Sequence, residues 1–256
     1  MKVEHRFGLA GRQALVIGGG SGIGRAIAVG LAEAGADVHL AGRREDVLEG
    51  ACGQLRALGR SSRAFPVDAT DMDALREFVG AVGVSVGLPD ILVNAQGVMQ
   101  LAAAEDYEPE DYDRIMDTNV KSVWFASSWF GRAMLGRGSG CIISIASLAS
   151  YRGFARNGIY CMSKHGVKAM TETLASEWAA RGVRVNAIAP GFFMTALNKD
   201  SMTEERKARA VARTPMGRFG DLDELAGAAI YLASPAAKYV TGVTIPVDGG
   251  FLAAGM

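Results

Sequence analysis

The sequence predicts an α/β domain in which a parallel sheet of about seven strands carries helices on both faces. Short apolar runs alternate with longer segments of helical periodicity along the whole chain, which is typical of consecutive strand–helix–strand units. At 256 residues, 49% of them hydrophobic, the chain is long enough to bury one large core. No repeat, low-complexity tract or linker divides it. We therefore expect residues 1–256 to form a single doubly wound domain.

The first strand–turn–helix unit predicts a nucleotide site. After a polar tail over residues 1–7, the apolar run 13–17 is typical of a buried strand, and a helix is expected over residues 25–34. The turn between them contains Gly18, Gly20, Ser21, Gly22, Ile23 and Gly24. Glycines permit a tight turn and a close backbone approach, and the N–H groups of a helix N-terminus attract a pyrophosphate. This arrangement predicts a Rossmann dinucleotide site, although a glycine-rich turn can also occur without a ligand.

The end of the second expected strand, residues 37–41, bears on which nicotinamide cofactor is used. An acidic side chain there would bind the ribose 2′-OH of NAD(H) and repel a 2′-phosphate. Here Gly42 holds that position, and Arg43 and Arg44 follow it. Because arginine pairs with phosphate, the pattern favours NADP(H) and leaves NAD(H) open. The alternative is that both arginines simply begin a solvated helix.

The remaining elements continue the alternation. Strands are expected over residues 64–67, 91–93, 141–145, 183–188 and 243–247, and helices over about 71–82, 110–135, 158–180 and 222–232. Residues just past two of these strands face the expected cofactor edge, namely Asp68, Ala69, Asn94, Ala95 and Gln96. Asp68 and Asn94 either contact the cofactor or cap the element that follows. The polar, charged segment over about 191–214 is expected to form a substrate lid.

Tyr160 and Lys164 are the candidate acid–base pair. Four residues apart on a helix, they share one face, so the ammonium is expected to lower the pKa of the phenol. Taken alone, such a pair is common on helix surfaces. Ser147 stands beyond the strand 141–145, and Asn119 lies inside an expected helix, where a polar amide needs a partner.

With these residues in place, the sequence resembles the short-chain dehydrogenase/reductase family over essentially its whole length. Within it, the likeness is to the gluconate 5-dehydrogenase and 2-deoxygluconate 3-dehydrogenase group. The family's glycine motif is matched with Ile17 in place of the usual threonine, and residues 94–97 match its Asn-Asn-Ala-Gly turn only at the first and last positions. The catalytic tetrad is matched without a substitution by Asn119, Ser147, Tyr160 and Lys164. The segment that holds the nicotinamide carboxamide corresponds to Pro190, Gly191, Phe193 and Thr195.

The resemblance implies hydride transfer between the nicotinamide and a secondary alcohol or ketone, here a polyol or sugar acid. Tyr160 would act as general acid/base and Ser147 would bind the reacting oxygen. Lys164 would also hold the nicotinamide ribose, and Asn119 would fix a proton-relaying water. The expected substrate residues are Gln96, Ser147, Arg152, Arg156 and Phe192. Either arginine suits a carboxylate, unless both point outward or toward another subunit.

Two other functions remain open at this point. The first is a 3-oxoacyl-carrier-protein reductase, which requires a basic patch for its acidic partner. The second is a non-catalytic NADP(H) redox sensor. The resemblance and the aromatic side chains of Trp124, Phe125, Trp129 and Phe130 suggest a homotetramer, with residues 251–256 at an interface.

Composition argues against other partners. The 27 basic and 27 acidic residues balance, so neither nucleic acid nor an anionic membrane surface is expected to bind. No apolar run approaches a membrane span, and a cytoplasmic location is expected. The three cysteines, Cys52, Cys141 and Cys161, lack metal-site spacing and the three histidines are scattered, so neither disulfides nor a metal site is expected.

Overall fold

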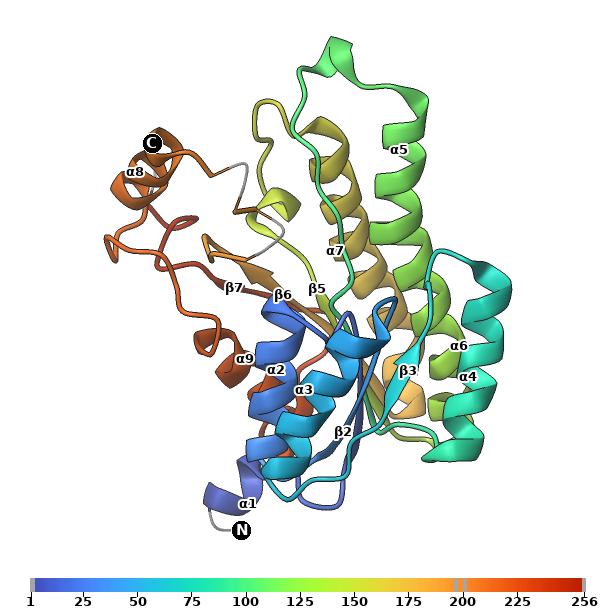
Figure 1. The fold of residues 1–256 in the computed structure, drawn as a ribbon. Helices are drawn as coiled ribbons and strands as arrows, with labels where there is room; N and C mark the ends of the chain where they lie inside the picture. Colours follow the sequence, from blue (N-terminus) through green and yellow to red (C-terminus); the bar gives the residue numbers. More distant parts are fainter. Residues whose placement is uncertain (1–2, 196–197, 200–201, 255–256) are drawn as a thin grey trace.

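The computed structural model describes residues 3–195, 198–199 and 202–254. Within these ranges one sheet of seven parallel strands has the order β3-β2-β1-β4-β5-β6-β7 (Figure 1). The strands are β1 (Gln13–Ile17), β2 (Asp37–Gly42), β3 (Ala64–Pro66), β4 (Ile91–Asn94), β5 (Gly140–Ile145), β6 (Val183–Pro190) and β7 (Thr244–Val247). The strand order reverses between β1 and β4, and such a switch point opens a crevice at the carboxyl ends of the strands. The predicted fold class is confirmed.

Helices cover both faces of the sheet (Figure 1). The α-helices are α1 (Val3–Phe7), α2 (Gly22–Glu33), α3 (Glu45–Ala57), α4 (Met72–Ser85), α5 (Pro109–Met116), α6 (Ser122–Arg137), α7 (Gly158–Trp178), α8 (Glu204–Arg213) and α9 (Glu224–Ala233). Shorter turns are η1 (Ala104–Asp106), η2 (Asp117–Lys121), η3 (Leu148–Ser150), η4 (Ala179–Arg181) and η5 (Pro235–Ala237). Helices α2, α3 and α9 pack on one face, and α4, α6 and α7 pack on the other.

Strand β1 shows why the apolar runs become buried strands. Ala14 and Val16 belong to the core under α2, α3 and α9, whereas Leu15 and Ile17 belong to the core under α4, α6 and α7. Successive side chains of a strand point to opposite faces, so a strand covered on both sides must be apolar at every position. The strand therefore lies rigidly between two cores and fixes the glycine turn at its end.

Two expectations about local structure need correction, and the expected lid gains a helix. The expected N-terminal tail instead contains α1, which contacts η5 and places the Phe7 ring 6.5 Å from that of Tyr231. The expected helix over 110–135 is divided by the π-helical turn η2, at Asn119. The expected lid contains α8, which begins after the N-cap Thr203, whose side chain accepts from the N–H of Arg206. Residues 1–2, 196–197, 200–201 and 255–256, parts of the expected tail, lid and C-terminal interface, lie outside the described residues.

None of the helices in the described part of the chain combines the length and apolar character that a membrane span requires.

Candidate active site

A cavity of about 530 Å³ lies at the carboxyl ends of β1, β2 and β4. Its size falls within the usual range for small-molecule sites, about 300–1,000 Å³. The predicted residues that line it are Gly18, Gly20, Ser21, Gly22, Ile23, Gly24, Arg43, Arg44, Asp68, Ala69, Ala95, Gln96 and Thr195. The predicted cofactor residues outside its lining are Asn94, Tyr160, Lys164, Pro190, Gly191 and Phe193. The structure therefore gathers the glycine turn, the arginines and the residues after β3 and β4 at one place.

The glycine turn is fixed by close backbone approaches. Gly18 has a φ of +80°, and a Cβ there would lie 2.7 Å from the backbone nitrogen of Gln96. A Cβ on Gly24 would lie 2.2 Å from the carbonyl oxygen of Gly18. Real Cβ atoms do not approach other atoms so closely, so these two positions require glycine for steric reasons. They bring α2 against the end of β1.

The N-terminus of α2 suits an anion. Ser21 precedes the helix without making a side-chain cap, and the first turn contains no acidic residue. Residues Ser21 to Gly24 line the cavity, so the positive end of the helix dipole faces it without a compensating charge. This end of the cavity fits the pyrophosphate of a dinucleotide.

The carboxyl end of β2 carries the residues that are expected to select the cofactor. Gly42, Arg43 and Arg44 line the cavity, and both arginine side chains are exposed. Asp68 Oδ1 accepts hydrogen bonds from the Thr70 N–H at 3.0 Å and the Thr70 hydroxyl at 2.7 Å. Burial raises the pKa of Asp68, but the Thr70 bonds and the Arg43 charge together lower it. The carboxylate thus caps its own turn, and Asp68 and Arg43 face the same space.

Ser147, Tyr160 and Lys164 come together beyond the end of β5. Ser147 precedes η3, and its hydroxyl accepts from the Ala149 N–H at 3.1 Å. It lies close enough to Tyr160, in the first turn of α7, to oppose the rise that burial causes in the pKa of that phenol. Lys164, one turn further along α7, is only 4% exposed; its Nζ donates to the Ile145 carbonyl at 2.7 Å and lies 5.7 Å from the centre of the Tyr160 ring. Burial lowers the pKa of Lys164 to about 8.

The sequence-based expectation for the Tyr160 pKa is wrong in this structure. Burial raises the pKa of Tyr160 above its ordinary value, and the hydrogen bond with Ser147 opposes that rise. The ammonium of Lys164 donates to the Ile145 carbonyl instead of to the phenol. The pairing of phenol and ammonium on one helix face is correct, but desolvation dominates the titration of the phenol.

Asn119 has a partner for each end of its amide. It is fully buried in η2; its Oδ1 accepts from the Val98 N–H at 2.8 Å, and its Nδ2 donates to the Val98 carbonyl at 2.9 Å. The same Nδ2 lies 2.9 Å from the Ser163 hydroxyl, on α7. A Cβ on Gly97 would lie 3.4 Å from Asn119 Oδ1 and 3.5 Å from Lys164 Nζ. Asn119 therefore ties the segment after β4, a wall of the cavity, to α7.

The two arginines between Ser147 and Tyr160 have different surroundings. Arg152 is half-buried, and one of its guanidinium nitrogens donates to the Leu252 carbonyl at 3.2 Å. Arg156 has an exposed side chain and a φ of +63°, unique among the non-glycine residues described. Its carbonyl accepts from the Ala102 N–H at 3.1 Å. The structure therefore uses Arg152 as an internal contact and leaves the Arg156 guanidinium facing solvent.

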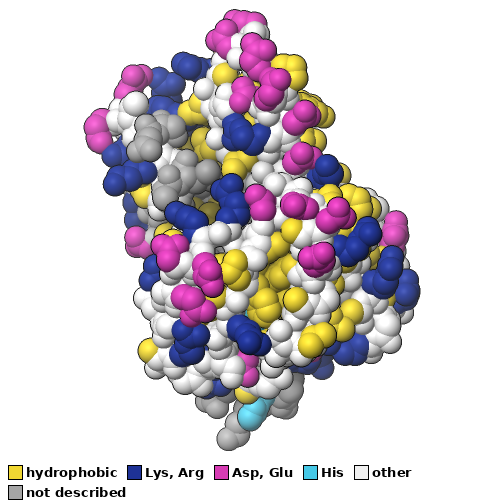
Figure 2. All heavy atoms as spheres, turned by 45° about the vertical axis from the view of Figure 1, so that its right-hand side comes forward, with side chains coloured by type: hydrophobic (Ala, Val, Ile, Leu, Met, Phe, Trp, Pro, Cys, Tyr) yellow, Lys and Arg dark blue, Asp and Glu magenta, His cyan; other side chains and the backbone are white. Residues whose placement is uncertain are grey.

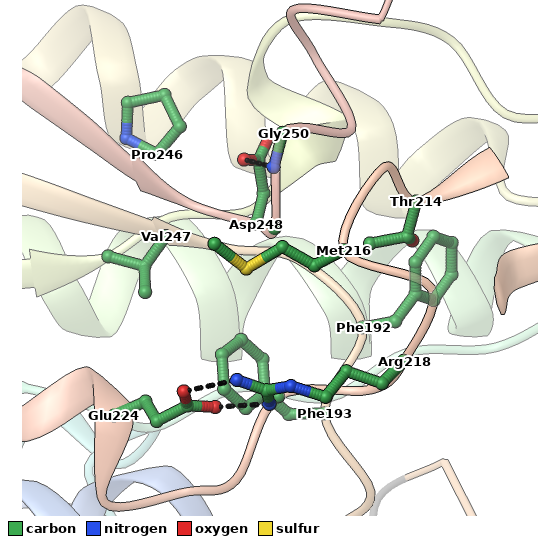
Figure 3. Close-up of a pocket in the computed structure, with 12 residues that line it drawn as sticks. Phe192, Phe193, Thr214, Met216, Arg218, Glu224, Pro246, Val247, Asp248 and Gly250 are labelled. Atoms are coloured by element: carbon green, nitrogen blue, oxygen red, sulfur yellow. Dashed lines mark hydrogen bonds and ion pairs between the residues drawn. The ribbon is translucent and has the colours of Figure 1, made fainter.

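A second cavity of about 370 Å³ lies beside the first residues after β6 (Figure 3). Phe192 and Phe193 line it together with Met216 and residues 246–250. Phe193, expected at the cofactor, is only 5% exposed and packs in the core under α9. Arg218 and Glu224 form an ion pair at 2.7 Å on its wall. No member of the tetrad lines this cavity.

Sequence reasoning missed several residues that build the site. Val98, Thr118 and Ser122 line the cofactor cavity, and Ser122 accepts a hydrogen bond from the Gln96 amide at 3.1 Å. The sequence did offer a signal for Ser122. It lies three residues after Asn119, and two polar side chains in an expected helix interior indicate a shared polar environment. Ser163, the partner of Asn119, adjoins Lys164 and gives no comparable signal.

Comparison with known proteins identifies the family of the chain. The family model described as Enoyl-(Acyl carrier protein) reductase matches residues 18–252, which include the glycine turn and the whole tetrad. The chain belongs to the short-chain dehydrogenase/reductase family. It is therefore an NAD(P)-dependent enzyme of the class that acts on CH–OH groups.

Among relatives of this short-chain dehydrogenase/reductase, gluconate 5-dehydrogenase of Gluconobacter oxydans (strain 621H) is 38% identical, over 95% of this chain and 96% of its own. The 2-dehydro-3-deoxy-D-gluconate 5-dehydrogenase of Pseudoalteromonas atlantica is 40% identical, over 96% and 98% of the two chains. The crystal structure of a gluconate 5-dehydrogenase from Burkholderia cenocepacia J2315 in complex with NADP and tartrate superposes with a TM-score of 0.96. It is 36% identical and covers 99% of this chain and 100% of its own. The expected family and enzyme group are confirmed.

Proposed function

We propose that this enzyme transfers a hydride between NADP(H) and a secondary hydroxyl or ketone of a sugar acid or polyol, with Tyr160 as general acid/base. The observation that carries the proposal is the buried Lys164 ammonium, 5.7 Å from the centre of the Tyr160 ring and one helical turn along α7, with Ser147 beside the phenol. Asn119 joins their helix to the wall of the dinucleotide cavity. A binding protein without catalysis has no need of a buried ammonium beside a phenol.

The mechanism follows from the positions of these groups. The cofactor supplies hydride acceptance or donation at its nicotinamide ring. Tyr160 removes the hydroxyl proton during oxidation and returns it during reduction. Ser147 donates a hydrogen bond where charge develops on the reacting oxygen. Because burial raises the pKa of Tyr160, the protonated form dominates near neutral pH and suits the reduction direction.

The preference for NADP(H) is supported by the charge at the end of β2. Gly42 offers no carboxylate to the ribose 2′-OH, and Arg43 and Arg44 line the cavity there. The gluconate 5-dehydrogenase from Burkholderia cenocepacia binds NADP. Introducing Gly42→Asp should raise the KM for NADPH and lower that for NADH, with Gly50→Asp, an exposed position on α3, as the charge-matched control. An unchanged ratio of the two KM values would contradict this cofactor assignment.

A sugar acid is supported by the unused guanidinium of Arg156. A carboxylate accepts two parallel hydrogen bonds from guanidinium, and Arg156 lies four residues before Tyr160, in the loop that Ser147 begins. The two relatives described above act on gluconate or on a gluconate derivative by name. Arg152 is a weaker candidate, because it already donates to the Leu252 carbonyl.

Charge near the site disfavours an acyl-carrier protein as partner. The segment that contacts the carbonyl of Arg156 continues into η1 and α5, where acidic side chains gather (Figure 2). The exposed ones are Glu105, Asp106, Glu108, Glu110 and Asp113. On α8, Lys207 and Arg209 pair with Glu204 and Glu205. An acidic carrier protein would be repelled from the α5 side, which favours a small substrate.

Assembly and location are also part of the proposal. A homotetramer is supported by the aromatic surface of α6, where Trp124 is 37% exposed and the Phe125 and Trp129 rings lie 5.3 Å apart. Phe130, by contrast, belongs to the core. A reducing compartment such as the cytoplasm is supported by three buried, unpaired cysteines, Cys52, Cys141 and Cys161. Analytical ultracentrifugation tests the tetramer, and a monomeric sedimentation coefficient would contradict it.

One panel of substrates tests the reaction itself. Sugar acids, the matching neutral polyols and an acetoacetyl thioester are assayed by absorbance with NADP(H) and with NAD(H). We expect the highest kcat/KM for a sugar acid or polyol with NADP(H). A preference for the acetoacetyl thioester would contradict the substrate class, and turnover with none of them would contradict the activity.

A further inference from the structure

The C-terminal segment, residues 248–254, contacts three segments that are far apart in the sequence: the loop 148–157, the residues just after β6 and the end of α8. We call these three segments the substrate side. At its centre Phe251 is only 5% exposed. The Phe251 ring lies 6.3 Å from the ring of Phe154, in the loop between Ser147 and Tyr160. It lies 5.3 Å from the ring of Phe192, just after β6, and the Arg213 guanidinium at the end of α8 stands 5.4 Å over it.

Hydrogen bonds from the Asp248 side chain and close packing at Gly249 hold the C-terminal segment in this position. The Asp248 carboxylate accepts from the N–H of Gly250 at 2.9 Å (Figure 3). It also accepts from the N–H of Leu252 at 2.9 Å and so closes the segment into a turn. Gly249 has a φ of +61°, and a Cβ there would lie 2.7 Å from a methyl group of Thr214, directly after α8. The turn is therefore packed against the end of α8, and the position of Gly249 has room only for glycine.

The loop between Ser147 and Tyr160 depends on such contacts for its shape. Over residues 148–157, apart from the single turn η3, it has no regular secondary structure. On one side Arg152 donates to the Leu252 carbonyl at 3.2 Å, and the Tyr151 hydroxyl donates to the Thr244 carbonyl, in β7, at 2.7 Å. On the other side the carbonyl of Arg156 accepts from Ala102. The loop connects Ser147, beyond the end of β5, to Tyr160 in the first turn of α7.

We infer that the C-terminal segment positions the substrate side of the active site, with Phe251 and Arg152 as positioning residues that hold the loop 148–157 and the end of α8 in one arrangement. Aromatic pairs and a cation over a ring each contribute specific geometry beyond simple burial. None of these contacts reaches the glycine turn or the cofactor cavity. Removing the contacts of Phe251 or Arg152 should therefore weaken substrate binding and leave cofactor binding intact.

Phe78 provides a matched control for Phe251. Its side chain is 6% exposed, and its ring makes two edge contacts, at 5.7 Å with Phe65 and at 5.8 Å with Phe130. Phe251→Leu and Phe78→Leu thus remove an aromatic ring of nearly equal burial and contact. Only the first lies beside the loop 148–157. Both keep a large apolar side chain, which favours folding.

The test combines kinetics with hydrogen exchange. In Phe251→Leu and in Arg152→Met, we expect the substrate KM to rise about tenfold or more, with the Kd for NADPH, followed by its fluorescence, within about twofold of wild type. Phe78→Leu should leave both constants near wild type. The double variant Arg152→Met/Phe251→Leu should fall short of the product of the single effects, because both residues hold one segment. Equal changes in substrate KM and NADPH Kd, or the same change in Phe78→Leu, would overturn the inference.

The kinetic arm rests on the proposed function, whereas hydrogen exchange does not. In Phe251→Leu, amides of residues 148–157 should exchange at least about tenfold faster than in wild type, and in Phe78→Leu they should not. Unchanged exchange in that loop would overturn the inference even if the enzyme turns over a sugar acid. Faster exchange without turnover on any substrate would uphold the positioning role and contradict the proposed function instead.

Discussion

The cofactor side and the substrate side of this enzyme are built by different means. On the cofactor side, the backbone forms the site. Glycines bring α2 within contact distance of β1, and the N-terminus of α2 faces the cavity. On the substrate side, side chains from distant segments meet: Phe154, Phe192 and Arg213 all contact Phe251. The first arrangement depends on local conformation, whereas the second depends on the positions of four chain segments at once. We expect mutations on the two sides to differ in kind.

The largest effect should come from the residue at which the two sides meet. Tyr160→Phe removes the proton donor and keeps the ring, so kcat should fall about 10²- to 10⁴-fold while NADPH binding persists. Stopped-flow absorbance with saturating cofactor measures this. Ser147→Ala should also lower kcat and should shift the pH–rate inflection upward, because it removes the hydrogen bond that opposes the raised pKa of Tyr160. Near-wild-type turnover of Tyr160→Phe would remove the assignment of this residue.

How far the sequence could predict the structure follows the same division. The seven parallel strands, the glycine turn and the arginines after β2 were all predicted, because apolar runs and glycine positions reflect local constraints. The π-helical turn at Asn119 was not, because it arises from hydrogen bonds to Val98, 21 residues earlier in the chain. Likewise nothing near Arg152 in the sequence indicates its contact with the carbonyl of Leu252, 100 residues later.

A pair of helical glycines tests whether the cofactor side is held by steric contact. A Cβ on Gly24 would lie 2.2 Å from the Gly18 carbonyl oxygen, whereas one on Gly53, exposed on α3, would meet nothing within 4 Å. Gly24→Ala should lower the free energy of unfolding by about 3 kcal/mol and weaken NADPH binding. Gly53→Ala should raise the free energy of unfolding by about 0.5–1 kcal/mol. Urea denaturation compares them, and equal results would contradict the steric argument.

Lys164 lies at the boundary between the two sides, and its burial should make stability depend on pH. Its pKa is lowered to about 8 in the folded state, from 10.5 for an ordinary lysine. Between these pH values the unfolded chain therefore binds more protons than the folded one, so the free energy of unfolding rises with pH. The part of that free energy that depends on Lys164 is complete above about pH 10.5 and is lost as the pH falls through 8. The difference in unfolding free energy between wild type and Lys164→Met should change by up to about 3 kcal/mol between pH 7 and 10.5.

The change should favour wild type at the higher pH. Lys238→Met, at an exposed position, provides the control and should give a nearly constant difference over the same range. Urea denaturation at several pH values measures both variants. A constant difference for Lys164→Met would mean that the ammonium is as well solvated in the folded enzyme as in the unfolded chain.

The smallest expected effects come from Arg156, where two variants separate the role of the backbone conformation from the role of the guanidinium. Its φ of +63° costs an ordinary residue about 1 kcal/mol relative to glycine, so Arg156→Gly should be more stable than Arg156→Ala. If the guanidinium binds a carboxylate, both variants should raise the KM for a sugar acid about tenfold and leave that for the matching neutral polyol unchanged. Equal effects on both substrates would place the role of Arg156 in the loop conformation. In that case Arg156→Gly, which adopts this φ freely, should retain more activity than Arg156→Ala.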